Sequence, residues 1–155
     1  MKLLARLIST GLGIGYFPIA PGTMGALAIL ILYWIMPPIS TRELLIIIFV
    51  LTIVGIYSAT LTEEEVKQKL GSEKGVDPKI VIIDEIIGML IALVAIPKTA
   101  KYVIAAFFLF RVFDIVKPYP IRKIEKLPTG WGIVFDDVMA GIYANLLLQL
   151  GRAFF

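Results

Sequence analysis

Acidic residues stand inside the apolar segments of this sequence, where an ionised side chain is costly to bury and is therefore a functional candidate. Five carboxylates share this setting: Asp84, Glu85, Asp114, Asp136 and Asp137. Carboxylates held at one depth repel each other unless protons or cations compensate them, and hard divalent cations prefer ligand sets made only of oxygen. The surplus of negative charge therefore favours a Mg²⁺ site.

The residue types that are missing narrow the chemistry further. The sequence has no cysteine and no histidine, which excludes thiolate and imidazole metal ligands, cysteine nucleophiles and a phosphohistidine intermediate. Catalysis has to use carboxylates, hydroxyls, lysine or arginine, with or without a metal held by oxygen. Hydrolysis would proceed through a metal-activated water or an aspartyl-phosphate, and the sequence leaves both open.

Basic residues that could bind phosphate lie close to these acids. Arg111 and Lys117 each stand three residues from Asp114, and a proline-stiffened basic strip over residues 117–123 includes Arg122. Such a strip suits an anionic lipid headgroup. The plainer alternatives are that Arg111 is only a structural partner of Asp114 and that the strip only anchors the chain at the membrane.

A glycine-rich segment over residues 9–25 is a candidate anion cradle, because glycine exposes backbone N–H groups where a helix begins. It contains Thr23 directly after Gly22, and it lacks the Gly-Lys-Ser/Thr ending of a P-loop. The alternatives are that the segment is a tight turn and that Thr23 is an ordinary helix N-cap.

Composition places these groups in a membrane protein. Of the 155 residues, 59% are hydrophobic and 17% are charged, and the mean hydropathy is +0.91. A soluble domain carries about 25% charged residues, and so short a chain could not enclose this much apolar surface. We therefore expect one membrane-embedded domain over residues 1–155. We attribute the net charge of +3 to cytoplasmic loops, and no aromatic-interleaved basic patch indicates nucleic-acid binding.

Five apolar segments predict an all-α fold, a small polytopic membrane helix bundle with about five spans. The segments cover residues 23–38, 44–60, 80–96, 102–116 and 132–150. With a cytoplasmic N-terminus and alternating spans, ten of the fifteen Lys and Arg residues fall on the cytoplasmic side, four fall outside and Arg111 lies within a span. This topology brings the five carboxylates and the start of the first span to the cytoplasmic end.

Two segments are expected outside the spans. Residues 61–79 open with Thr62-Glu63-Glu64-Glu65, a capping-box pattern that predicts a short cytoplasmic helix with a solvated, charged face. Residues 1–22 are expected to form an interfacial N-terminal segment.

Small residues one helical turn from the acids predict how the helices pack. Gly88 follows Asp84 by four residues, and Gly141 follows Asp137 by four residues. Small residues let helices approach closely in lipid. We therefore expect the acids to point into the bundle.

Four blocks of residues, in order, carry a resemblance to a known family. They are Gly13-Ile14-Gly15 through Ala20-Pro21-Gly22-Thr23-Met24-Gly25; Ile82-Ile83-Asp84-Glu85 with Gly88; Phe110-Arg111-Val112-Phe113-Asp114 with Lys117-Pro118-Tyr119-Pro120-Ile121-Arg122; and Gly130-Trp131-Gly132-Ile133 with Asp136-Asp137 and Ala140-Gly141. Over nearly its whole length the chain resembles the phosphatidylglycerophosphatase A family. Ala26 stands where that family often has serine and Thr129 where glycine is frequent, and neither departure removes a charged group.

The resemblance implies a Mg²⁺-dependent, multi-pass phosphatase of the inner membrane. It would remove the terminal phosphate of phosphatidylglycerophosphate, a phospholipid, at the cytoplasmic face and leave phosphatidylglycerol. The implied roles are Mg²⁺ and water binding by Asp84, Glu85, Asp136 and Asp137, a metal ligand or base at Asp114, phosphate binding by Arg111, Lys117 and Thr23, and contact with the glycerol or second phosphate by Arg122. Asp77 also fits the family pattern, or it caps a helix.

Two other classes of function are compatible with buried acids. One is a small ion- or proton-coupled membrane transporter, although transporter sites usually lie near the bilayer midplane between repeated halves, and no internal repeat is evident. The other is a non-enzymatic membrane subunit that binds anionic lipid. The sequence determines neither the number of metal ions nor the oligomeric state, and a homo-oligomer is compatible with it.

Overall fold

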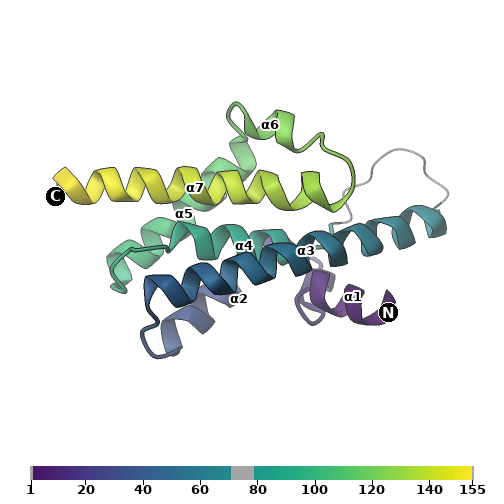
Figure 1. Cartoon of the computed structure of the whole chain (residues 1–155), viewed down its shortest axis with the longest axis horizontal. Helices are drawn as coiled ribbons and strands as arrows, with labels where there is room; N and C mark the ends of the chain where they lie inside the picture. The colour runs from purple at the N-terminus through teal and green to yellow at the C-terminus, as the bar shows by residue number, and fades with distance from the viewer. Residues whose placement is uncertain (1, 71–78, 155) are drawn as a thin grey trace.

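The computed structural model describes residues 2–70 and 79–154, and every regular element among them is helical (Figure 1). The elements are α1 Lys2–Ser9, the 3-10 turn η1 Ile14–Tyr16, α2 Pro21–Ile35, α3 Thr41–Leu70, α4 Ile83–Ala92, α5 Ala100–Val116, α6 Ile121–Ile124 and α7 Gly130–Phe154. The prediction of an all-α fold is confirmed for this part of the chain.

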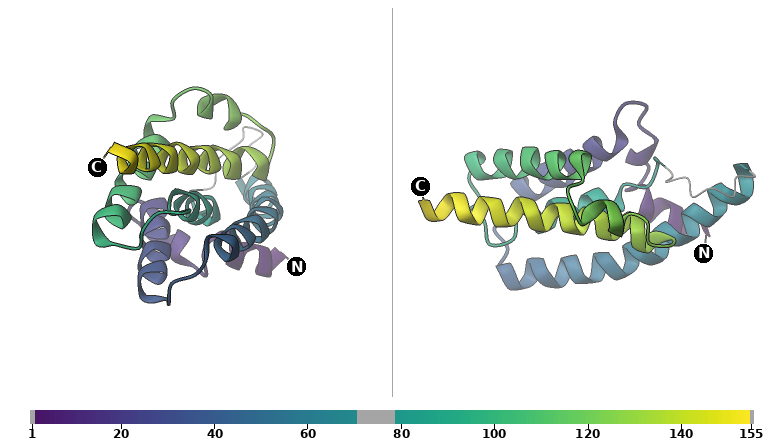
Figure 2. Two further views of the ribbon diagram at one scale, coloured as in Figure 1. Left: turned by 60° about the vertical axis from the view of Figure 1, so that its left-hand side comes forward. Right: turned by 90° about the horizontal axis from the view of Figure 1, so that it is seen from above.

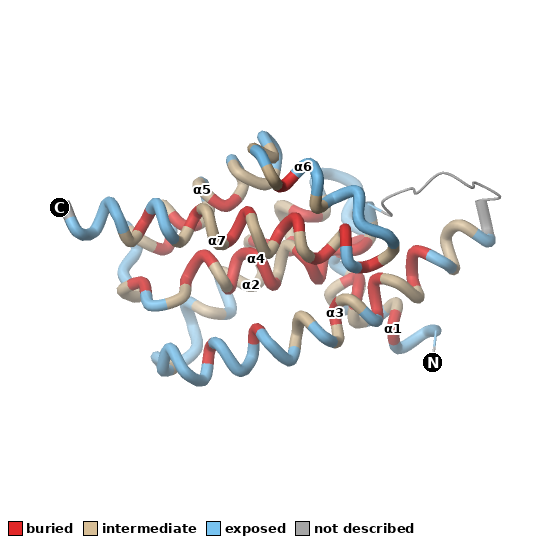
Figure 3. Tube along the Cα trace, turned by 45° about the horizontal axis from the view of Figure 1, so that its top comes forward, coloured by how far each residue is buried: buried red, intermediate tan, exposed pale blue. Residues whose placement is uncertain are grey.

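The short helix α4 forms the centre of the bundle, with α2, α3, α5 and α7 packed around it (Figure 2). Its side chains are accordingly among the most buried in the protein, as the red trace of α4 shows (Figure 3). Ile87 and Met89 have no exposed surface at all. The first residues of α4, which include Asp84 and Glu85, are therefore held by packing on several sides.

Two helices are long and apolar enough to cross a membrane, α3 over Thr41–Gln68 and α7 over Gly130–Ala153. The prediction of about five spans is not confirmed. The expected span over residues 80–96 contains only the ten residues of α4, which at 1.5 Å per residue reach about 15 Å, half of a bilayer core. The helix α2 is apolar but shorter than the two candidate spans.

The early end of α4 has a tertiary cause. The amide of Asn145 in α7 donates hydrogen bonds to the carbonyl oxygens of Ala92, at 3.1 Å, and Val94, at 2.7 Å. These bonds satisfy carbonyl groups that would otherwise be left without a donor at a helix end inside the bundle. The backbone can therefore turn at this point, although no proline or glycine marks it.

Large apolar side chains cover the outside of the bundle. On α3, the side chains of Leu45, Phe49, Val50 and Ile53 are all exposed. Exposed apolar surface of this extent is typical of a protein that faces lipid. Together with the two candidate spans, it supports the prediction of a membrane protein.

The short cytoplasmic helix that we predicted after residue 61 is not separate. It is the continuation of α3, which runs without a break to Leu70 because no proline or glycine interrupts residues 56–70. Thr62 consequently does not cap a helix, and its hydroxyl shares a hydrogen bond of 2.8 Å with Ser9. The prediction of a solvated face was wrong for Glu63, which is only 6% exposed.

The N-terminal segment folds back onto the end of α3 and the start of α4. Arg6 of α1 forms an ion pair with Glu65 of α3, and the N–H of Ile82 donates a hydrogen bond of 2.8 Å to the carbonyl of Ser9. Gly15 packs so closely on the carbonyl of Ile80 that no side chain would fit there. These contacts anchor the glycine-rich segment beside the first turn of α4.

Candidate active site

Three of the predicted carboxylates converge on one point. Asp84 and Glu85 lie in the first turn of α4 and Asp137 lies in α7, and one oxygen from each can be chosen so that all three are within 4.8 Å of one another. A side-chain hydrogen bond also links Glu85 to Asp84. We call these three residues the carboxylate cluster; Asp84 and Asp137 are buried and Glu85 is partly buried.

A close helix crossing produces this convergence. A Cβ atom added to Gly88 would lie 2.6 Å from the carbonyl oxygen of Asp137 and 2.5 Å from the ring of Phe110. Only glycine fits at that position, so α4 and α7 approach each other as the sequence pattern predicted. Asp84 and Asp137 each stand one turn before the glycine of their own helix at this crossing.

The first turn of α2 forms another wall of the cluster. A side chain on Gly22 would overlap the carboxylate of Glu85, so the backbone of this turn lies directly against Glu85. The N-cap of α2 is Ala20, in the left-handed region at φ 46°, and it offers no side-chain hydrogen bond. The alternative of Thr23 as an N-cap is therefore excluded, and Thr23 stands in the first turn beside Gly22.

Asp114 and Arg111, near the end of α5, border the cluster. A side-chain hydrogen bond connects Asp114 to Asp137, and Asp114 also acts electrostatically on Glu85. Arg111 Nη1 lies 2.6 Å from Asp114 Oδ2 in a half-buried ion pair. Arg111 is thus the structural partner of Asp114 and brings a positive charge to the edge of the cluster.

Lys117 and Asp136 form a second ion pair beside the cluster. Lys117 Nζ lies 2.6 Å from Asp136 Oδ2 and 2.6 Å from Glu125 Oε1. Burial by itself lowers the pKa of Lys117, but the hydrogen bonds and charges of Asp136 and Glu125 outweigh it and raise the pKa above its usual value. Lys117 therefore remains positively charged. The sequence did not predict this role for Glu125. The chain turns after Lys117, and no periodic pattern in that turn indicates that Glu125 comes back to Lys117.

One predicted residue, Arg122, makes its contact away from the cluster. The guanidinium of Arg122 donates a hydrogen bond of 3.1 Å to the carbonyl of Val116, at an exposed position. Asp77 lies outside the residues that the structure describes.

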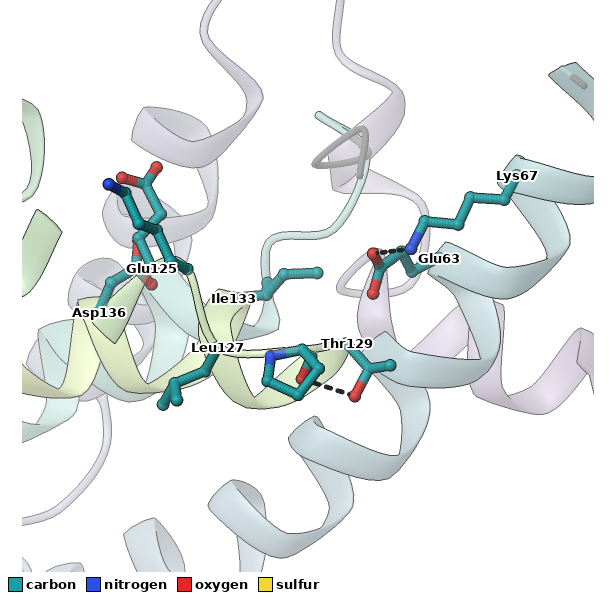
Figure 4. Close-up of a pocket in the computed structure, with 9 residues that line it drawn as sticks. Glu63, Lys67, Glu125, Leu127, Thr129, Ile133 and Asp136 are labelled. Carbon is teal, nitrogen blue, oxygen red and sulfur yellow. Dashed lines mark hydrogen bonds and ion pairs between the residues drawn. The ribbon is translucent and has the colours of Figure 1, made fainter. Parts of the chain in front are cut away.

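A pocket of about 520 Å³ opens next to Asp136 (Figure 4). Its walls come from the C-terminal half of α3, the segment after α6 and the first turns of α7. The charged and hydroxyl side chains that line it are Glu63, Lys67, Glu125, Lys126, Thr129 and Asp136. Glu63 and Lys67 stand four residues apart on α3 and form an ion pair, with 2.5 Å between Oε1 and Nζ.

The donor set of the carboxylate cluster fits a hard divalent cation. All three residues offer carboxylate oxygen, the ligand type that Mg²⁺ prefers. Glu85 Oε2 is buried, and no hydrogen-bond donor reaches it from the described residues. A buried carboxylate oxygen in that position is costly unless a cation or a donor binds to it.

Comparison with known proteins relates the chain to lipid phosphatases. Residues 7–152 match the family model described as phosphatidylglycerophosphatase A. The chain is 40% identical to phosphatidylglycerophosphatase A of Haemophilus influenzae, covering 92% of this chain and 85% of that protein, and 34% identical to that of Escherichia coli, covering 95% and 83%. It is 43% identical, over 97% of this chain and 95% of the relative, to a Bacteroides thetaiotaomicron protein provisionally named phosphatidylinositol-3-phosphatase.

No solved structure matches the chain. The match to the family model covers almost the whole sequence, and the residues at the helix crossing fall within it. The chain belongs to the phosphatidylglycerophosphatase A family and is a lipid phosphate monoester hydrolase of the membrane.

Proposed function

We propose that this protein is a Mg²⁺-dependent phosphatase that removes the terminal phosphate of phosphatidylglycerophosphate at the cytoplasmic face of the inner membrane. The convergence of Asp84, Glu85 and Asp137 within 4.8 Å is the observation that carries the proposal. Two buried carboxylates and a partly buried third, with little compensating charge of their own, are suited to a divalent cation. The family assignment favours hydrolysis over the transporter and the non-enzymatic lipid-binding subunit.

Asp84, Glu85 and Asp137 would hold the metal ion, with Asp114 and Asp136 bordering them. Bound Mg²⁺ would neutralise charge on the phosphate oxygens and lower the pKa of a bound water. The burial of Asp84 and Asp137 strengthens the electrostatic interactions within the cluster.

Lys117 and Arg111 would bind the phosphate on the side away from the metal ion. Lys117 keeps its charge and sits beside Asp136, and Arg111 sits beside Asp114. Both are fixed by ion pairs, so little reorganisation is needed when an anion arrives. Asp114, paired with Arg111 at the border of the cluster, would act as a metal ligand or base. The first turn of α2, with Thr23, would contact a phosphate oxygen.

The polarity of the helices supports a site at one membrane surface. Contacts join the start of α2 to the start of α4, and the start of α4 to the first half of α7 and the end of α5. The acids thus gather at the end where α2, α4 and α7 begin and α5 ends. The excess of Lys and Arg predicted at this end favours the cytoplasmic side.

The names of the relatives leave two headgroups to distinguish, glycerol in phosphatidylglycerophosphate and inositol in phosphatidylinositol 3-phosphate. The family model and two relatives favour the first. The test is phosphate release by the purified protein in detergent from both lipids, with Mg²⁺ and after chelation. We expect release that requires Mg²⁺ and is at least about tenfold faster from phosphatidylglycerophosphate. Release that survives chelation, or a preference for the inositol lipid, would contradict the proposal.

A further inference from the structure

The pocket beside Asp136 has no role in the chemistry derived above. It extends from Asp136 in α7 to Glu63 and Lys67 in α3 (Figure 4), and Thr129 and Lys126 are also among the residues that line it. Because Asp136 borders the carboxylate cluster, a ligand whose phosphate lies at the cluster can reach into this space.

Glu63 is the unusual residue of this pocket. It is 6% exposed, and Oε1 pairs with Lys67. The second oxygen, Oε2, is buried, and within the described part of the chain it has no hydrogen-bond partner. A buried carboxylate oxygen without a hydrogen-bond donor costs stability, so a ligand that donates a hydrogen bond to this oxygen would be favoured.

The remaining walls indicate what kind of donor fits. Carboxylates of Glu63, Glu125 and Asp136 line the pocket together with the ammonium groups of Lys67 and Lys126. A second phosphate would gain from the two lysines but would be repelled by the three carboxylates. Neutral hydroxyl groups suit the carboxylates and the lysines alike, because a hydroxyl can donate a hydrogen bond to a carboxylate and accept one from an ammonium group.

We propose that this pocket binds the hydroxyl-bearing, polyol part of the lipid headgroup next to the phosphate that is removed, with Glu63 Oε2 accepting a hydrogen bond from a hydroxyl. This inference rests on the proposed phosphatase function. It also accounts for recognition of a headgroup rather than of phosphate alone. Glycerol and inositol share this chemistry, and the experiment separates them.

The first test measures binding by the wild-type protein and needs no turnover. Dissociation constants are measured by calorimetry, in detergent with Mg²⁺, for glycerol 3-phosphate, inositol 3-phosphate and ethyl phosphate, which has no hydroxyl. We expect at least one polyol phosphate to bind about tenfold more tightly than ethyl phosphate, the effect of one hydrogen bond to a charged group. The tighter of the two identifies the polyol. Equal binding of all three would overturn the inference.

The second test assigns the effect to Glu63. Glu63→Met removes the acceptor with little change of shape, and Glu64→Met, at the exposed neighbouring position, is the matched control. We expect Glu63→Met to lose the polyol preference while the affinity for ethyl phosphate changes less than about twofold, and Glu64→Met to keep the preference. A preference that survives in Glu63→Met would overturn the role of Glu63.

The two proposals fail in different ways. If the wild-type protein binds the polyol phosphates selectively but hydrolyses neither lipid, the phosphatase proposal fails. If it hydrolyses lipid but binds ethyl phosphate as tightly as the polyols, the pocket proposal fails alone.

Discussion

The carbonyl oxygen of Gly88 occupies the space that a side chain on Gly141 would need. At this contact the backbone of α4 meets the backbone of α7, and the acids one turn earlier, Asp84 and Asp137, are brought into one cluster. The metal-binding geometry therefore depends on two residues that carry no functional group.

The crossing can be tested by adding one methyl group. Gly141→Ala places a Cβ against the backbone of Gly88, which cannot move aside as a side chain can. We expect the free energy of unfolding in detergent to fall by about 1–3 kcal/mol. Gly151→Ala, in the same helix with open space around it, should change it by less than about 0.5 kcal/mol. Equal effects of the two variants would contradict the role of the crossing.

A methyl group on Gly22 should act differently. It would meet the carboxylate of Glu85, the flexible end of a side chain, so the carboxylate shifts and the backbone stays. We expect Gly22→Ala to weaken the apparent Mg²⁺ affinity in the phosphatase assay about tenfold or more, with the thermal unfolding temperature little changed. An unchanged Mg²⁺ dependence would show that the close packing of Gly22 on Glu85 does not matter for metal binding.

The sequence allowed part of this arrangement to be predicted. The spacing of Asp84 from Gly88 and of Asp137 from Gly141 indicated two acids on helix faces with small residues, because this relation lies within each helix. The end of α4 at Ala92 was not predictable. Residues 93–96 remain apolar, and the groups that accommodate the turn come from Asn145, more than fifty residues later.

Replacing that donor tests why α4 is short. Asn145→Leu leaves the carbonyls of Ala92 and Val94 without their donor inside the bundle. We expect a loss of about 1–3 kcal/mol in the free energy of unfolding. Leu146→Met, at the exposed neighbouring position, is the control and should change it by less than about 0.5 kcal/mol. A neutral Asn145→Leu variant would show that these bonds do not support the turn.

The charged residues of the site were predictable in type but not in pairing. Lys117 and Arg122 belong to the same basic strip, and sequence reasoning gave both a role toward the substrate. The structure places Lys117 on Asp136 and Arg122 on a backbone carbonyl. Likewise the sequence predicted that Glu63 is solvated. In the structure it is buried and shares a pocket with residues of α7 and of the segment after α6, whose positions no local pattern reveals.

This difference between the two basic residues predicts unequal effects on turnover. Lys117→Met removes a charge fixed at the cluster, and we expect kcat/KM for the lipid to fall about 100-fold. Arg122→Met removes an exposed charge, and we expect a loss of no more than about fivefold. Similar losses in the two variants would show that Arg122 reaches the substrate in a way that its contact with Val116 does not indicate.

The most direct test of the central claim is divalent-cation binding itself. Mn²⁺, which shares the oxygen-ligand preference of Mg²⁺, can be titrated into the purified protein and followed calorimetrically without substrate. If Asp84, Glu85 and Asp137 hold the ion, Asp137→Asn weakens binding at least about 100-fold while Glu64→Gln, at an exposed position on α3, leaves it as in the wild-type protein. Equal affinity of the two variants for Mn²⁺ would contradict the account.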